Sequence, residues 1–394
     1  MIFKGISRQV WIISIVSFFT DIASEMLYPI VPFYLRSIGF SILFIGILEG
    51  IAEFLAGISK GYFGGLSDTK NSRKPFIQFG YALSAISKPM MAAAIYPLWI
   101  LFARSIDRLG KGIRTGARDA LLNNESTAET KGKIFGFHRS LDTFGAVLGP
   151  IVALVLLHFY SFTYKEIFVF AFLPGMVAVA FTFFIKEKKS IKKQVEKISF
   201  LKSIEYFKSS NVTFKKVTLG FFVFGLFNST DVFLLLKAKE AGIGDIDVIK
   251  LYIFYNLIYA LMAFPAGIVA DKLGAKKVLV AGFLIFAGVY AGFSIATDLN
   301  TFLILFFLYG LYAASTEGIA KAYLSKYIYK NEAGIAFGTY AAFQSIAALF
   351  ASIFAGFIWI QLGAKFTFII TSLVAVGVAI YFLAIGHSKP ISEK

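Results

Sequence analysis

Apolar stretches of about twenty residues follow one another along the whole chain, with short polar segments between them. A helix of that length crosses the hydrocarbon core of a bilayer, where the backbone must satisfy its own hydrogen bonds. Of the 394 residues, 58% are hydrophobic and 16% are charged, whereas a typical soluble domain is about 25% charged. These features predict an all-α, polytopic membrane protein.

Hydropathy places about twelve spans along the chain. They are expected near residues 10–35, 41–66, 75–96, 98–118, 133–158, 164–185, 217–237, 248–270, 277–296, 301–322, 334–360 and 365–386. No small-residue cleavage site follows the short N-terminal segment, so we expect the first span to be retained. We expect three parts: a six-helix bundle over 1–185, a cytoplasmic lysine-rich linker over 186–216 and a second six-helix bundle over 217–394.

The formal net charge of +16 is unevenly distributed, and its positions argue against a nucleic-acid partner. Ten lysines fall between Lys186 and Lys216, and the other basic clusters also lie between spans. Basic residues gather in this way in cytoplasmic loops under the positive-inside rule. The pattern predicts an integral protein of the plasma (inner) membrane with both termini cytoplasmic. Two interpretations of the linker stay open, an amphipathic helix on the inner membrane surface and a solvated connection.

The two halves of the chain share sequence patterns at a nearly constant offset. GGLSDTKNSRK ends the second predicted span and GIVADKLGAKK ends the eighth, which places Asp68 and Asp271 203 residues apart. The pairs Phe135-Gly136 and Phe337-Gly338 lie 202 residues apart. The offset indicates an internal duplication. Two six-helix repeats with a site between them are a known transporter architecture.

At these loops the chain resembles the major facilitator superfamily, and the resemblance covers nearly its whole length. The superfamily's loop signature is matched by Gly267, Asp271, Lys272, Gly274, Lys276 and Lys277, and more loosely by Gly64, Leu66, Asp68, Arg73 and Lys74. In the first copy Asn71 replaces a glycine and the two basic residues come one position late. The resemblance implies a conformational latch, in which the aspartate caps a neighbouring helix end and pairs with a basic residue.

Two further segments resemble superfamily patterns. Arg104, Asp107, Gly110 and Gly112 follow its fourth-span pattern, although Arg108 replaces a usual glycine, and Gly145, Gly149 and Pro150 resemble its antiporter signature without the trailing glycines. One subgroup shares the strings Asp21-Ile-Ala-Ser-Glu25 and Asp107-Arg-Leu-Gly-Lys-Gly-Ile-Arg-Thr115. The resemblance implies Arg104 in proton handling and favours export by antiport.

Ionisable residues within membrane spans are costly, so each is a candidate for function. Our candidates for the proton and substrate path are Asp21, Glu25, Glu49, Glu53, Arg104, Asp107, Arg139, Asp142, Asp231, Glu317 and Lys321. Asp21, Glu25 and Glu53 are deep and lack an obvious partner on their own helix. Burial disfavours the charged form of a carboxyl group, so we predict that one of these three carries a proton and that Arg104 modulates it.

Structural interpretations compete with several of these roles. The pairs Arg139–Asp142 and Glu317–Lys321 are spaced to neutralise each other within one helix and to hold an inner gate. Lys111, Arg114, Arg118 and Asp119 lie at the inner end of the fourth span, where we expect loop residues, and His138 is expected to be a packed polar side chain.

The sequence therefore predicts a proton-coupled antiporter that exports a small amphipathic or cationic solute by alternating access. Proton-coupled uptake of a metabolite, metal or siderophore efflux and a non-transporting sensor are the alternatives. Cysteine is absent, and we find no Gly-x-Ser-x-Gly, His-Glu-x-x-His or phosphate-loop motif, so we expect no enzyme. Expected partners are a small-molecule or ion substrate, the proton and the lipid bilayer. We expect no cofactor, no metal site and a monomer.

Overall fold

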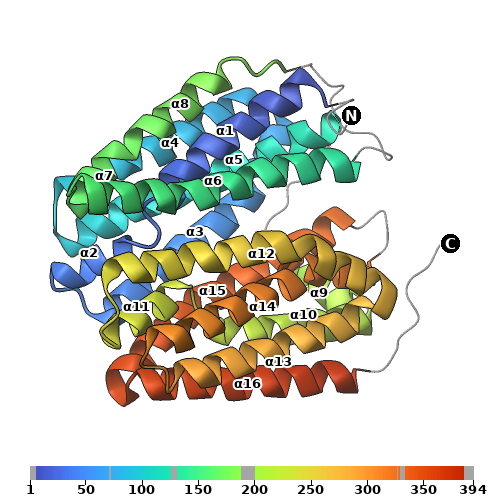
Figure 1. Cartoon of the computed structure of the whole chain (residues 1–394). Helices are drawn as coiled ribbons and strands as arrows, with labels where there is room; N and C mark the ends of the chain where they lie inside the picture. The colour runs from blue at the N-terminus through green and yellow to red at the C-terminus, as the bar shows by residue number, and fades with distance from the viewer. Residues whose placement is uncertain are drawn as a thin grey trace. The chain divides into compact units, whose positions relative to one another are not determined.

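The computed structural model describes residues 6–70, 72–125, 131–187, 200–325, 327–328 and 333–385. Every regular element in these ranges is a helix (Figure 1). The chain divides into two compact units. Unit 1 comprises Met1–Ile38 and Ile51–Ile198, and unit 2 comprises Gly39–Gly50 and Ser199–Lys394.

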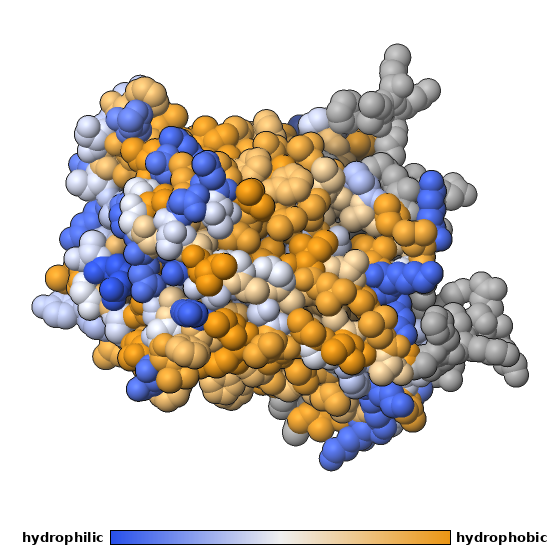
Figure 2. Space-filling view, turned by 60° about the horizontal axis from the view of Figure 1, so that its bottom comes forward, coloured by the Kyte–Doolittle hydropathy of each residue, from blue (hydrophilic) through white to orange (hydrophobic). Residues whose placement is uncertain are grey.

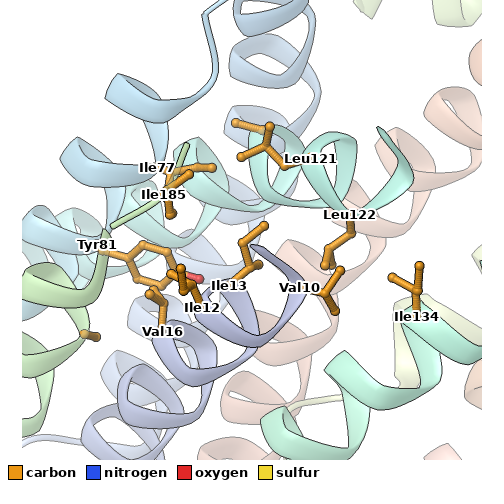
Figure 3. Close-up of a cluster of buried hydrophobic side chains, with 12 residues drawn as sticks. Val10, Ile12, Ile13, Val16, Ile77, Tyr81, Leu121, Leu122, Ile134 and Ile185 are labelled. Atoms are coloured by element: carbon orange, nitrogen blue, oxygen red, sulfur yellow. The ribbon is translucent and has the colours of Figure 1, made fainter. Parts of the chain in front are cut away.

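Unit 1 is built around two packed helix pairs. Its helices are α1 (Arg8–Glu25), α2 (Val31–Ser37), α3 (Ile42–Thr69, whose first residues belong to unit 2), α4 (Lys74–Ala93), α5 (Pro97–Asn124), α6 (Lys131–Phe159), α7 (Tyr164–Phe170) and α8 (Phe172–Thr182). The helix α1 packs along α6 and α8, and α4 packs along α5 and α8. At one end of this bundle, apolar side chains from five helices or their ends meet, and Figure 3 shows Tyr81 beside Ile12 and Val16.

Unit 2 repeats this arrangement. Its helices are α9 (Phe200–Ser209), α10 (Val212–Phe227), α11 (Val232–Glu240), α12 (Asp245–Leu273), α13 (Ala275–Phe293), α14 (Leu299–Ser325), α15 (Ala333–Leu362) and α16 (Ala364–Ala384). The helix α10 packs along α15 and α16, and α13 packs along α14 and α16. These pairs correspond in order to α1 with α6 and α8, and to α4 with α5 and α8. The starts of α3 and α12, Ile42 and Asp245, are 203 residues apart.

Nine candidate spans in the described residues are long and apolar enough to cross a membrane. The charged helix α5 is not among them, nor are α1 and α4. When α1 with α2, α7 with α8 and α10 with α11 each count as one crossing, the described helices other than α9 make twelve. The predicted all-α, polytopic fold is confirmed.

The outer surface of α16 shows why a bilayer is needed. Leu373, Ile380 and Leu383 are each at least 60% exposed. On the face in Figure 2, apolar side chains cover the middle and hydrophilic ones gather at its two ends. Water solvates such an apolar surface poorly, whereas lipid tails cover it at no cost.

The segment predicted as a linker is partly helical. Its residues 188–199 lie outside the described ranges, and α9 and the start of α10 occupy the rest. The helix α9 packs on α15 through Phe207 and Phe343, whose ring centroids are 4.8 Å apart. An amphipathic helix therefore exists in this segment, and its placement on the membrane surface stays a prediction.

The first crossing of each unit is broken at an equivalent place. The helix α1 ends at Glu25 and α10 ends at Phe227, and α2 and α11 resume at Val31 and Val232. In the first break Pro29 and Pro32 remove backbone donors and disfavour a continuous helix. The second break holds Asn228-Ser-Thr230, whose short polar side chains compete with the helix for backbone hydrogen bonds.

The basic residues of the two signature loops hold the end of the last helix in their own unit. Lys74 Nζ donates to the Phe183 carbonyl oxygen at 2.9 Å, beyond the end of α8. Lys276 Nζ donates to the carbonyl oxygens of Leu383 and Ile385 at 3.3 and 2.6 Å, at the end of α16. The carbonyls at a helix C-terminus lack partners within the helix, and a lysine there supplies donors and positive charge.

Replacing Lys276 with methionine is expected to lower the free energy of unfolding by about 1 kcal/mol, because the end of α16 loses its donor. Denaturant titration of the purified protein in detergent measures the change. Lys277→Met removes an exposed charge next to it and is the matched control, with no expected effect. An equal loss in both variants would contradict the capping role.

Candidate functional site

Asp21 and Asp142, two of the predicted path residues, lie close together in unit 1 and are both partly exposed. Their carboxyl groups, from α1 and α6, lie close enough to influence each other electrostatically. Two carboxyl groups that lie close together in this way are coupled, so protonation of one affects protonation of the other. Lys111 and Glu25 also lie close to Asp21.

The antiporter-like motif explains how α1 and α6 approach so closely. A side chain at Gly145 would place its Cβ 3.2 Å from the Asp21 Cβ. A Cβ at Gly149 would lie 2.7 Å from the Ile22 carbonyl oxygen and 2.8 Å from the Met26 nitrogen. Both glycines therefore let the two backbones touch, as small residues do in packed membrane helices. Gly145 comes three residues after Asp142, so this contact aligns the two carboxyl groups.

Gly149→Leu is expected to lower the free energy of unfolding by about 1–3 kcal/mol, because the new side chain overpacks the contact between α1 and α6. Unfolding in detergent measures this loss. A Cβ at Gly377 of α16 would meet nothing within 4 Å, so Gly377→Leu is the control. Equal stability of the two variants would show that α1 and α6 tolerate separation at this motif.

Two other predicted path residues form ion pairs in unit 1. Arg108 Nη2 lies 3.3 Å from Glu53 Oε1, which joins α5 to α3. Arg139 Nη1 lies 3.1 Å from Asp142 Oδ2 within α6, and the arginine side chain is 62% exposed. The predicted pairing of Arg139 with Asp142 is thus present in the geometry. Asp142 also faces Asp21, so Arg139 cannot be treated as its sole neighbour.

A buried ion pair joins α4 to α5. Lys88 Nζ lies 2.6 Å from Asp107 Oδ1, and the side chains are 3% and 7% exposed. Arg104 Nη1 lies 3.6 Å from Asp107 Oδ2. The lysine also donates to Ser24 Oγ at 3.2 Å, near the end of α1. These contacts hold three helices together and favour a structural role for Asp107, whose place in a transport path stays a prediction.

The expectation of loop residues after the fourth span is wrong, because α5 continues to Asn124. Arg114 is buried and donates to Ser84 Oγ at 2.6 Å, and its guanidinium lies 4.6 Å from the Tyr81 ring centroid. Arg118 donates to Ser17 Oγ at 3.2 Å and pairs with Asp119. The positive charges suggested a loop, but polar partners on α1 and α4 accommodate these arginines within the helix.

Glycines in the string that runs from Asp107 to Thr115 set the packing of α5. A Cβ at Gly110 would lie 2.6 Å from the Gly80 carbonyl oxygen, and one at Gly112 would lie 2.8 Å from the Ala56 carbonyl oxygen. The string therefore brings α5 against α4 on one side and α3 on the other, and this contact lets Lys88 reach Asp107.

Several other residues singled out by sequence have defined surroundings. Glu49 is 1% exposed and lies in the part of α3 that belongs to unit 2. Glu25 is partly exposed at the end of α1. His138 is buried, and its Nδ1 lies 3.3 Å from Ser14 Oγ, as expected for a packed polar residue.

In unit 2 two of the predicted path acids accept hydrogen bonds from tyrosines. Tyr309 donates to Asp231 Oδ1 at 2.7 Å, and Tyr259 donates to Glu317 Oε2 at 2.8 Å. The side chain of Lys321 lies outside those described, so its predicted pairing with Glu317 stays a prediction.

The latch residues are only partly described. The side chains of Asp68 and Asp271 fall outside the described ones, so the latch stays a prediction. A Cβ at Gly64 would lie 3.5 Å from the Gly116 Cα of α5, whereas one at Gly267 would meet nothing within 4 Å. Gly274 joins α12 to α13 with φ of 95°, a conformation that favours glycine.

The start of α4 is capped by a side chain from beyond the end of α8. The Glu187 carboxylate accepts from the backbone nitrogens of Arg73 and Lys74 at 2.6 and 3.1 Å. An anion at a helix N-terminus satisfies donors that have no partner within the helix.

No group of three or more histidine, cysteine or acidic residues in the described part of the chain is arranged to hold a metal ion.

The comparisons with known proteins agree with this architecture. The model of the Major Facilitator Superfamily matches residues 13–256 and 238–394. An uncharacterized MFS-type transporter of Methanocaldococcus jannaschii is 32% identical over 379 residues, which cover 95% of this chain and 94% of the relative. The multidrug resistance protein MdtH of Yersinia pestis is 28% identical over 152 residues, 37% of each chain. The crystal structure of the nucleoside transporter NupG has a TM-score of 0.77 at 15% identity and covers 97% of this chain and 100% of that one. The chain therefore belongs to the Major Facilitator Superfamily of integral membrane transporters.

Proposed function

We propose that this protein is a proton-coupled antiporter that exports a small amphipathic or cationic solute across the plasma membrane. The observation that carries the proposal is that Asp21 on α1 and Asp142 on α6 lie together where Gly145 lets the two helices touch. The multidrug resistance protein MdtH, which matches part of this chain, supports a role in drug resistance. The protein acts as a monomer with both termini in the cytoplasm.

The proton step uses the two carboxyl groups as one site. The Asp21 carboxyl group belongs to α1 and the Asp142 carboxyl group to α6. A shift of α1 relative to α6 therefore changes how well the two groups share a proton. Arg139 Nη1 is already 3.1 Å from Asp142 and supplies positive charge when the shared proton leaves. Glu53 pairs with Arg108 and is therefore less suited to carry the proton than the sequence alone predicts.

We assign solute binding to helix breaks, and each unit carries such a break in its own first crossing. Interrupted helices at corresponding positions of two repeats expose backbone groups where a substrate needs them. Asp21 lies one turn before the first break, and Asp231 lies within the second. Solute and proton then compete for acidic groups near the breaks, and alternating access converts this competition into exchange.

The test is proton flux in vesicles that contain the purified protein and an internal pH dye. Organic cations, amphipathic neutral compounds, metabolite anions and divalent metal ions are added in turn under an imposed pH gradient. We expect an organic cation or an amphipathic compound to accelerate collapse of the gradient. Acceleration by a metabolite that moves in the same direction as the proton would establish symport instead.

A further inference from the structure

The break between α10 and α11 carries an aromatic and polar cluster that is separate from the Asp21–Asp142 pair. Asp231 accepts from Tyr309 at 2.7 Å, and Asn228 Nδ2 donates to the Tyr312 hydroxyl at 3.1 Å. The ring centroids of Tyr309 and Tyr312 are 5.3 Å apart, and those of Tyr309 and Tyr255 are 4.9 Å apart. Helices α10 to α12 and α14 thus bring their polar groups to one place.

Two polar atoms of this cluster have no hydrogen-bond partner among the described residues. They are Asn228 Oδ1 and Thr230 Oγ1, and both are buried. A buried polar atom without a partner costs about 1–3 kcal/mol, and its presence in a folded protein calls for an explanation. The residues Asn228, Thr230 and Asp231 are otherwise partly exposed, so the cluster reaches the surface of unit 2.

The chemistry of the cluster selects its ligand. An amide oxygen, a hydroxyl and a carboxylate all accept hydrogen bonds, and the carboxylate adds negative charge. Tyrosine ring faces attract cations. A ligand with N–H donors and positive charge satisfies the orphaned acceptors and the carboxylate together, whereas an anion is repelled by the carboxylate and a quaternary ammonium ion has no donor.

We propose that the break between α10 and α11 binds a small organic cation with N–H donors, a protonated amine or a guanidinium, through Asn228, Thr230 and Asp231. The site names the substrate class of the exporter and therefore rests on the proposed function. The N–H groups donate to Asn228 Oδ1, Thr230 Oγ1 and the Asp231 carboxylate, and the tyrosine rings lie against the charge.

The test is equilibrium binding to the full-length protein in detergent, with phenethylamine and benzylguanidinium as probes. Their matched controls are 2-phenylethanol, which is neutral, and the trimethylated amine, which lacks N–H donors. We expect both probes to bind more tightly than either control. Equal binding of phenethylamine and 2-phenylethanol would overturn the site.

Substitutions in the cluster test whether the probes bind at the break between α10 and α11. Asp231→Asn and Thr230→Val are each expected to weaken binding of both probes by about 10- to 100-fold, the effect of one charge-assisted hydrogen bond. Asp247→Asn removes an exposed acid elsewhere in unit 2 and is expected to leave binding unchanged. If Asp231→Asn fails to fold, Thr230→Val tests the site instead, because valine keeps the shape of the threonine side chain and removes only its hydroxyl group. Folded variants that bind as tightly as the wild type would overturn the proposal.

Binding is measured without a proton gradient, so its outcome is separate from that of the coupling. Probe binding without proton movement in vesicles would leave this site standing and contradict antiport. Proton movement driven only by solutes that lack N–H donors would leave antiport standing and overturn the site.

Discussion

Vesicles that contain the Asp142→Asn variant are expected to lose uphill solute transport by about 100-fold or more, because asparagine cannot release the proton that the pair shares. Asp21→Asn is expected to give the same loss, since each carboxyl group is half of one site. The measurement is accumulation of labelled benzylguanidinium under an imposed pH gradient.

Solute exchange separates a coupling defect from a folding defect. Exchange of labelled for unlabelled solute needs no net proton movement, so both variants are expected to retain it. Glu166→Gln removes an exposed acid at the start of α7 and is the matched control, with accumulation unchanged. Full accumulation by either aspartate variant would remove the carboxyl pair from the mechanism.

Asp107→Leu is expected to produce the largest loss of stability, about 3–5 kcal/mol, because it leaves Lys88 charged and buried without its partner. Lys88 Nζ is 2.6 Å from Asp107 Oδ1, and the lysine side chain is 3% exposed. Arg104 loses the same carboxylate at 3.6 Å. Denaturant titration in detergent, followed by the near-ultraviolet circular dichroism, measures the change.

The double variant Lys88→Met/Asp107→Leu tests whether the loss comes from an unpaired charge. Replacement of both members of a buried ion pair by apolar residues is often nearly neutral, so the double variant is expected to regain most of the stability. A double variant as unstable as the sum of the single variants would show that each side chain acts through other contacts.

Span positions followed well from the sequence because hydropathy is a local property. The predicted span over 41–66 corresponds to α3 (Ile42–Thr69), and that over 365–386 corresponds to α16 (Ala364–Ala384). The prediction for the end of the fourth span was wrong. Lys111, Arg114 and Arg118 are strongly polar, yet they lie within α5, which continues to Asn124. Neighbouring helices supply hydrogen-bond partners for Arg114 and Arg118.

Partners across helices could not be predicted. Asp21 meets Asp142, and Lys88 meets Asp107, only because particular turns of different helices face each other. The rotation of each helix about its own axis cannot be predicted from a single sequence. A partial signal existed in Gly145 and Gly149, since small residues four apart mark a face of close contact.

The two helix breaks differ in how clearly the sequence marks them. Pro29 and Pro32 mark the first break in the sequence, whereas Asn228-Ser-Thr230 contains no proline or glycine. The internal offset of about 203 residues connects them, because Glu25 and Asn228 occupy equivalent positions. A search for interruptions at matching positions would have found the second break from the first.

The direction of proton movement against solute movement is the most direct measurement. Vesicles are loaded with benzylguanidinium, whose charge does not change near neutral pH, and are diluted into solute-free buffer without a pH gradient. Antiport predicts that the lumen becomes acidic as the solute leaves, and that Asp142→Asn vesicles show no such change. An alkaline shift, or an acid shift of equal size in Asp142→Asn vesicles, would contradict proton-coupled export through the Asp21–Asp142 pair.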